Sequence, residues 1–221
     1  MDFHISVMHP NDKPAPATVA GSVCRALSPH RMLGMVRQWQ YSLTSKFRPN
    51  LAPGAVETLD RVLNGAETGF EWGSGRSTPW LARRVGRLVS VEHDPMWHHW
   101  VNRRLPPNAD AHCILRRLEN GNPTDCGYVQ AVQQFEDQSL DLCLIDGRMR
   151  RECALAVLPK MAHGGLIVLD DVQRYLEVSD DQGCYEARTA EWEPFVRRVC
   201  GWPCLWERSL LRHTAIWVKL V

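Results

Sequence analysis

The chain has 221 residues, of which 44% are hydrophobic and 23% are charged. This length suits one α/β domain with a modest extension, or two small domains, and we expect one main domain. The 26 Lys and Arg residues against 25 Asp and Glu give a formal net charge of +1, so no global field favours a nucleic acid or an anionic membrane as partner.

The partner is therefore expected to be a small molecule. No apolar run approaches the roughly 18 to 20 residues needed to span a bilayer, and the first residues, MDFHISVMHPNDKPAPAT, lack the basic and apolar regions of a secretory signal. We expect a cytoplasmic protein with no membrane partner. The 8 cysteines lie mostly in apolar segments without paired zinc-ligand spacing, which predicts buried thiols.

The amino-terminal part differs in pattern from the rest of the chain. Residues 1 to about 20 are rich in Pro, Ala, Asp and Asn, which is typical of a tail or arm. Helical periodicity follows over 29–47 and again over 52–65, the second with Pro53 near its start. We divide the chain into an amino-terminal arm and helical extension, 1–65, and a main domain, 66–221.

Short apolar strands then alternate with helical patterns. The expected strands are 68–72, 88–92, 110–115, 140–146 and 165–170, and the expected helices are 78–85, 95–105, 125–135 and 150–162. Such alternation predicts a doubly wound parallel sheet with right-handed crossovers. Trp97 and Trp100, at i and i+3, are expected to pack on the sheet.

The carboxy-terminal part departs from this alternation. A long irregular segment, 171–186, precedes a helix around 187–199. Two strand-like runs, CLWERSLL and TAIWVKLV, follow with no helix between them, so they are expected to pair antiparallel.

The turn after the first strand reads FEWGSGRST. In an open parallel sheet the ligand lies beyond the carboxyl ends of the strands, and the first strand's turn is the usual cradle. Gly73 and Gly75 let the backbone approach a ligand, and Ser77 and Thr78 can cap the next helix. Carboxylates at the ends of the first two strands, from Glu71 and Glu92, could accept hydrogen bonds from ribose hydroxyls or a cationic amine.

At these positions the sequence resembles the class I S-adenosylmethionine-dependent methyltransferases. FEWGSGRST is similar to their first motif, LVSVEHDP to the second strand with its ribose-binding acid, LDLCLIDGRMR to the fourth-strand motif and GGLIVLDD to the fifth. The resemblance covers about 68–175, and the terminal hairpin agrees with the family's reversed seventh strand. It implies a Rossmann-like, mostly parallel seven-stranded sheet with an antiparallel C-terminal hairpin.

The resemblance also implies S-adenosylmethionine as cofactor and a set of residues that contact it. The cofactor-binding residues would be Glu71, Gly73, Ser74, Gly75, Ser77 and Thr78 around the methionine part, Glu92 and His93 around the adenosine, and Asp146. A nicotinamide-dependent Rossmann oxidoreductase is the rival for the same fold. Thr78 in place of a third glycine, and an acid before the turn that would repel a pyrophosphate, favour S-adenosylmethionine.

Three further carboxylates are expected at the same sheet edge: Asp146, Asp170 and Asp171. They could bind a divalent cation, act on the substrate as a base or polar contact, or form structural pairs with nearby arginines. Asp171 and Met149 depart from the metal-dependent catechol-type pattern, so we expect no metal site.

The resulting prediction is a methyltransferase acting on an O or N atom of a small molecule. We name Asp146, Asp171 and His163 as catalytic residues, and His93 and His213 as further candidate bases. A catalytically silent cofactor-binding or scaffold protein is the alternative from another class. The sequence leaves open whether the protein is a monomer or a homodimer.

Overall fold

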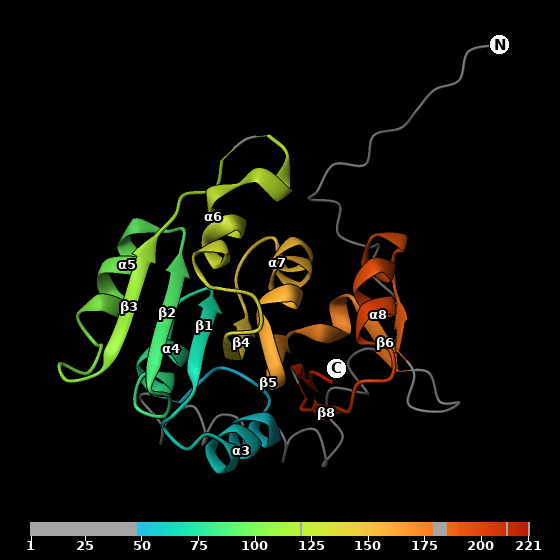
Figure 1. The fold of residues 1–221 in the computed structure, drawn as a ribbon, viewed down its shortest axis with the longest axis horizontal. Helices are drawn as coiled ribbons and strands as arrows, with labels where there is room; N and C mark the ends of the chain where they lie inside the picture. The colour runs from blue at the N-terminus through green and yellow to red at the C-terminus, as the bar shows by residue number, and fades with distance from the viewer. Residues whose placement is uncertain (1–47, 120, 179–184, 211, 221) are drawn as a thin grey trace, which may run out of the picture. The chain divides into compact units, whose positions relative to one another are not determined.

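The computed structural model describes residues 48–119, 121–178, 185–210 and 212–220 (Figure 1). Within these ranges one sheet has the strand order β3-β2-β1-β4-β5-β9-β8. The strands are β1 (Thr68–Trp72), β2 (Arg87–Glu92), β3 (Asp110–Leu115), β4 (Leu140–Ile145), β5 (Met161–Asp170), β8 (Cys204–Arg208) and β9 (His213–Val218). Four of the five strands expected in the alternating part begin and end within one residue of their predicted bounds.

The pairing of these strands confirms the predicted fold class. β1 pairs in parallel with both β2 and β4, and parallel pairing continues to β3 and β5 at the two sides. β9 pairs antiparallel with β5 and with β8. The sheet is therefore Rossmann-like and mostly parallel, with seven strands and the expected antiparallel C-terminal hairpin.

The helices are shorter than their sequence patterns suggested. They are α3 (Pro53–Val62), α4 (Ser77–Leu81), α5 (Pro95–Asn102), α6 (Gly127–Gln130), α7 (Arg150–Val157) and α8 (Glu193–Val199). Short 3₁₀ segments extend the chain around them at Pro123–Asp125, Ala131–Gln134, Leu158–Lys160, Val172–Arg174 and Ala190–Trp192. The helix expected over 125–135 thus consists of one α-helical turn between two 3₁₀ turns.

The segment expected to be irregular contains a second, small sheet. β6 (Leu176–Val178) pairs antiparallel with β7 (Tyr185–Ala187). A three-residue strand is too short to show the alternation of apolar and polar residues by which a strand is recognised in a sequence.

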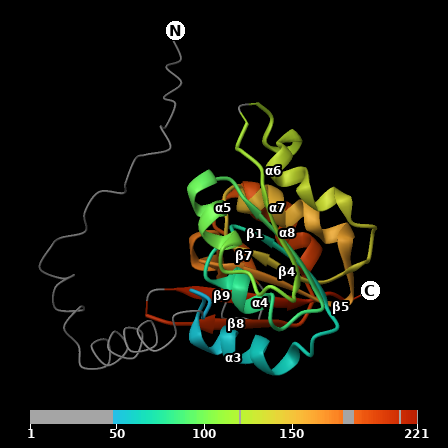
Figure 2. The ribbon, with the colours of Figure 1, turned by 90° about the vertical axis from the view of Figure 1, so that its left-hand side faces the viewer.

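Two clusters of buried apolar side chains hold the helices against the sheet. Figure 2 shows α3 on one side of the sheet and α6 and α7 on the other. One cluster joins α6, α7 and α8 to the sheet through buried side chains such as Tyr128, Val157 and Phe195. The other joins α3 and α4 through Leu59 and Leu81. Covering both faces is what a parallel sheet with apolar strands requires.

The proposed division at residue 65 stays a prediction, and the helix expected over 29–47 lies outside the described residues. Within the described part, Pro53 is the first residue of α3, as expected. The helix buries Ala55, Val56 and Leu59, and the preceding N–H of Ala52 donates to Oγ1 of Thr214 at 2.9 Å. The part of the proposed extension that can be seen is therefore packed on the sheet of the main domain.

The thiols differ in their burial. Cys113, Cys126, Cys143 and Cys153 are buried, as predicted, but Cys200 is exposed after α8 and Cys204 is half-buried. The prediction is wrong for Cys200, which follows the last turn of α8 and faces solvent. In the described ranges, no helix has both the length and the apolar character needed to cross a membrane.

Candidate functional site

A cavity of about 470 Å³ opens at the carboxyl ends of β1, β2 and β4. Because β1 pairs with both other strands, the turns that follow all three meet at one place. The cavity is lined by Asn50, Gly73, Ser74, Gly75, Arg76, Ser77, Glu92, His93, Asp94, Trp97, Asp146, Gly147, Arg148 and Arg150. This is the position at which open α/β sheets bind ligands.

The turn after β1 needs glycine for the chain's own packing. Gly73 has φ +87°, and a Cβ there would lie 2.5 Å from both N and Cα of Gly147. Gly147 is equally crowded, because its Cβ would meet the hydroxyl of Tyr128. The turns after β1 and β4 therefore contact each other through two glycines, and a side chain at either position would push the two turns apart.

Glu71 lies beneath this turn and is not among the residues that line the cavity. Its carboxylate is fully buried and accepts hydrogen bonds from Ser77 Oγ, from Thr78 Oγ1 at 2.6 Å and from Ser90 Oγ at 2.5 Å. Burial raises the pKa of Glu71, while the three hydroxyl groups act in the opposite direction. The arrangement makes Glu71 a residue that shapes the turn.

The hydroxyl of Thr78 extends this network to the glycine turn. Oγ1 accepts from the N–H of Gly75 at 2.9 Å and donates to Glu71, so it links the turn to the buried carboxylate. Ser74 Oγ lies 2.6 Å from Ser90 Oγ, on the neighbouring strand. Thr78 itself does not line the cavity, whereas Ser74 does.

Glu92 lines the cavity from the end of β2. Its Oε1 accepts from the N–H groups of His93 at 2.8 Å and Asp94 at 2.9 Å, which fixes the carboxylate in one orientation. Asp94 in turn caps α5 by accepting from the N–H of Met96 at 2.8 Å. A carboxylate held in this way has a second oxygen with which it can accept hydrogen bonds from a ligand.

His93 stands beside Glu92 and also lines the cavity. Its Nδ1 is buried and 2.8 Å from Oε1 of Glu92, but the contact lacks the direction of a hydrogen bond. The ring makes an edge contact with Tyr128, with centroids 6.0 Å apart. His93 therefore has hydrogen-bonding capacity that the described residues do not use.

Asp146 lines the cavity from the end of β4 and is paired with an arginine. Its Oδ1 lies 2.8 Å from Nη2 of Arg150, and 22% of its side chain is exposed. Burial and the neighbouring Asp170 raise the pKa of Asp146, while Arg150 and Arg212 oppose the increase. A partly open carboxylate with a raised pKa can exchange a proton near neutral pH.

Asp170 and Asp171 lie at the end of β5 and do not line the cavity. Asp170 is fully buried and accepts from Thr214 Oγ1 at 2.7 Å and from Arg212 at 3.2 Å. Asp171 is 3.1 Å from Nη2 of Arg174. Both carboxylates thus make the structural pairs that the sequence left open as one of three roles.

His163 lies elsewhere. It is exposed near the amino end of β5, whereas Asp170 closes the carboxyl end of the same strand. His163 and Asp170 are seven residue steps apart, and at about 3.3 Å per residue these steps span roughly 23 Å. We therefore withdraw His163 as a catalytic candidate, because the structure does not bring it together with Asp146.

His213 is also away from the cavity. It begins β9, its Nδ1 is 3.3 Å from Nε1 of Trp206, and burial lowers its pKa. Among the predicted histidines, His93 is the one that lines the cavity.

Sequence reasoning did not single out Arg150, which organises this edge of the sheet. Its guanidinium donates to the carboxylate of Asp146, to the carbonyl of Gly147 at 3.0 Å and to the carbonyl of Asp170 at 2.5 Å. It thus joins the ends of β4 and β5. The arginine run in LDLCLIDGRMRREC was visible, but only the tertiary structure shows which arginine turns inward.

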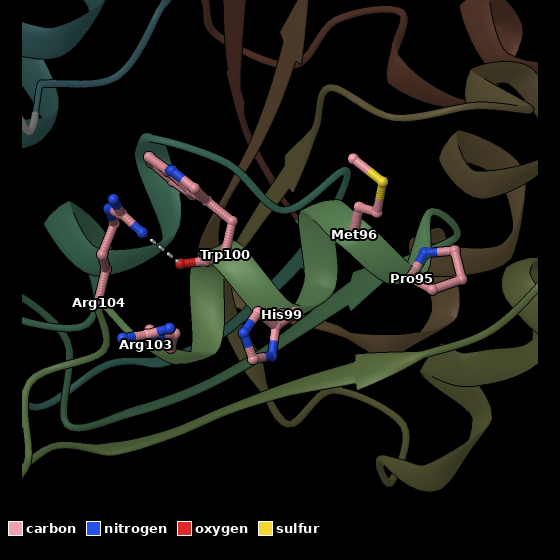
Figure 3. Close-up of a pocket in the computed structure, with 6 residues that line it drawn as sticks. All are labelled: Pro95, Met96, His99, Trp100, Arg103 and Arg104. Carbon is pink, nitrogen blue, oxygen red and sulfur yellow. Dashed lines mark hydrogen bonds between the residues drawn. The ribbon is translucent and has the colours of Figure 1, made fainter.

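A second hollow, of about 900 Å³, lies over the outer face of α5 (Figure 3). Trp100 lines this hollow, its ring stacks on that of Trp97 with centroids 4.8 Å apart, and the guanidinium of Arg104 lies over it at 3.8 Å. Trp97 is 43% exposed, so the expectation that this pair packs on the sheet is wrong; Val101 is the buried residue of α5. Trp97 instead donates from Nε1 to the carbonyl of Ser74 at 2.5 Å and forms one wall of the smaller cavity.

In the described ranges, no three His, Cys, Asp or Glu side chains gather closely enough to suggest a metal centre. The carboxylates expected as candidate ligands are each in contact with an arginine. The prediction that activity needs no divalent cation stays a prediction.

Comparison with known proteins identifies a methyltransferase domain. Residues 70–172 match the family model described as a methyltransferase domain. No curated protein matches the chain by sequence.

Solved structures that resemble the chain have low sequence identity to it. A protein from Corynebacterium glutamicum is 12% identical, with a TM-score of 0.54, over 91% of this chain and 98% of that one. A methyltransferase-like protein from Silicibacter pomeroyi is 22% identical, with a TM-score of 0.49, over 78% and 89%. The N-methyltransferase NodS from Bradyrhizobium japonicum is 14% identical, with a TM-score of 0.47, over 75% and 94%.

Only the first of these three likenesses is close enough to support the fold, and the family model covers the motifs around the cavity. The matched domain over residues 70–172 and the strand order support the expected resemblance of this part of the chain to the class I methyltransferases.

Proposed function

We propose that the protein transfers a methyl group from S-adenosylmethionine to an O or N atom of a small molecule. The observation that carries this proposal is the cavity over β1. Seven of the nine residues predicted to bind the cofactor line it, namely Gly73, Ser74, Gly75, Ser77, Glu92, His93 and Asp146, and the other two, Glu71 and Thr78, support the turn from below.

The cavity suits this cofactor in size and in chemistry. Its volume of about 470 Å³ falls in the range of small-molecule sites, which is about 300 to 1,000 Å³. Glu92 is fixed by backbone N–H groups and would accept hydrogen bonds from the ribose hydroxyls, with His93 beside the adenosine. The cofactor carries a sulfonium charge and no phosphate, so the acids around the turn would not repel it.

The cofactor supplies an activated methyl group, and the protein's contribution is positioning. The turn from Gly73 to Ser77 is held by the network of Glu71, so its backbone needs little rearrangement when a ligand binds. Trp97 lines one side of the cavity, where its ring would limit the access of water to a bound cofactor.

A proton must leave an oxygen acceptor or an ammonium group before or during methyl transfer. Asp146 is the predicted catalytic carboxylate that lines the cavity, and the raised pKa of Asp146 suits a proton acceptor. Asp171 would act on the acceptor only indirectly, because it pairs with Arg174 away from the cavity.

The test is methyl transfer from labelled S-adenosylmethionine to a panel of hydroxyl- and amine-bearing small molecules. If Asp146 takes the proton, Asp146→Asn lowers kcat by about 100-fold or more and flattens the rise of kcat with pH. Asp110→Asn, at an exposed carboxylate on the edge strand, is the matched control. Binding of the cofactor without any methylated product would instead support the catalytically silent alternative.

A further inference from the structure

The cavity has two flanks that differ in charge. Glu92 and His93 end β2 on one side of the turn, and Asp146 and Arg148 follow β4 on the other. β1 lies between these strands, so the flanks are about 9 to 10 Å apart at the backbone. If the adenosine occupies the β2 flank, as the proposed function requires, the acceptor must enter beside the β4 flank.

The acidic groups near the β4 flank are already paired. Arg150 lies 2.8 Å from Asp146, Arg212 contacts Asp170, and Arg174 contacts Asp171. Three carboxylates therefore face three guanidinium groups, and the donors of Arg150 are also used by backbone carbonyls. No acid of this cluster remains to neutralise a further cation.

Arg148 is that further cation. It lines the cavity, and its side chain is exposed. Its backbone N–H lies 3.3 Å from the hydroxyl of Tyr128 and its carbonyl accepts from Cys153, which fixes the position of the main chain. Within the described ranges its guanidinium has no hydrogen bond or ion pair, in contrast to Arg150 two residues later.

We propose that Arg148 binds an oxyanion of the methyl acceptor, so that the substrate is a small molecule bearing a carboxylate or phosphate group. A guanidinium presents a planar fork of donors that matches either group, and such pairs are among the strongest hydrogen bonds in proteins. This inference rests on the proposed function, because it takes the β2 flank as the cofactor's side. Arg148 would determine specificity while the proton is handled at Asp146.

One alternative gives Arg148 a different partner in the same cavity. The methionine part of S-adenosylmethionine has its own carboxylate, which an arginine could also bind. Binding of 5′-methylthioadenosine distinguishes a role of Arg148 toward the acceptor from a role toward the cofactor, because this compound keeps the adenosine but lacks the amino-acid carboxylate.

The first experiment titrates inorganic phosphate into the full-length protein, with and without S-adenosylhomocysteine, and follows the arginine Nε–H resonances by NMR. The Arg148 resonance is expected to shift saturably, and Arg148→Gln should weaken phosphate binding about tenfold or more. Arg148→Lys should have a smaller effect, and Arg61→Gln, at an arginine with 77% exposure on α3, none. No saturable shift, or an equal one in Arg148→Gln, would overturn the proposal.

The second experiment measures calorimetric affinities of Arg148→Gln and wild type for S-adenosylhomocysteine and 5′-methylthioadenosine. Unchanged affinity for both is expected. Weaker binding of S-adenosylhomocysteine alone would assign Arg148 to the cofactor and overturn the acceptor proposal. If wild type does not bind S-adenosylhomocysteine, the proposed function fails, and the phosphate titration without it still decides whether Arg148 binds an anion.

Discussion

Replacing the buried Glu71 with glutamine should change how stability depends on pH. Burial raises the pKa of Glu71 from its ordinary 4.5, against the opposite effect of Ser77, Ser90 and Thr78. Protonation of Glu71 therefore stabilises the fold fully below pH 4.5, and this stabilisation is lost as the pH rises through the raised pKa of the folded protein. Glu71→Gln has nearly the same shape but no charge to bury.

The size of the change in the free energy of unfolding follows from the one proton that Glu71 binds in the folded protein and releases on unfolding. Between the pKa values of the unfolded and folded states, the free energy of unfolding of wild type should fall relative to that of Glu71→Gln by up to about 1.4 kcal/mol per pH unit. Asp170 contributes to both proteins alike, whereas the charge of Glu71 itself helps to raise the pKa of Asp146, so the difference between the two proteins reports Glu71 together with this coupling.

The assay is urea unfolding of both proteins at intervals from pH 4.5 to 8, with Glu57→Gln as a control at an exposed glutamate of α3. The stability of Glu71→Gln minus that of wild type should rise with pH above 4.5. A difference that falls as pH rises would refute the reasoning, because the three hydroxyl groups would then outweigh the effect of burial on the pKa of Glu71.

Three further predictions concern the cavity. Glu92→Gln should keep the two backbone hydrogen bonds through its amide oxygen but weaken S-adenosylhomocysteine about ten- to hundredfold in calorimetry, since the amide NH₂ cannot accept from ribose; equal affinity would place the ribose elsewhere. Gly73→Ala should lower the urea midpoint far more than Gly164→Ala: both have positive φ, but only at Gly73 does the new Cβ meet backbone, and similar losses would mean the turns can separate. Methyl transfer should persist in excess EDTA, because Asp146, Asp170 and Asp171 each contact an arginine; loss of turnover in EDTA that Mg²⁺ restores would show a metal requirement.

The sequence predicted the fold well because strands and turns are local signals. The apolar runs ending at Glu92 and Asp146 located the ends of β2 and β4 to within a residue, and parallel topology then placed both carboxylates at one edge. The glycine turn was found in the same way. The cavity therefore contains most of the residues that were expected there.

The roles of individual side chains could not be predicted from the sequence, because they depend on contacts with residues that are distant along the chain. The role of Glu71 follows from Ser90, which faces it only because β1 and β2 pair in this register. The i, i+3 spacing of Trp97 and Trp100 indicates a helix but not which face is buried, and Val101 takes the buried place. Arg150 and Arg148 are similar in sequence context, and only their contacts distinguish the paired one from the exposed one.

The structure also changes the expected effect of altering the glycine turn. From the sequence alone, Gly73 is expected to let the backbone approach a ligand, so that a side chain there would meet the ligand first. Its closest neighbour is instead Gly147 of the same chain, 2.5 Å from a new Cβ. A variant at Gly73 would therefore report on stability before it reports on binding, and Glu92 is the better position for testing the cofactor.

The central claim is that the cavity over β1 binds S-adenosylmethionine, and calorimetry tests it most directly. S-adenosylhomocysteine, NAD and NADP are titrated separately into the wild-type protein. S-adenosylhomocysteine should bind saturably at one site per chain, with no comparable binding of either dinucleotide. Tight binding of NAD or NADP with no binding of S-adenosylhomocysteine would contradict it.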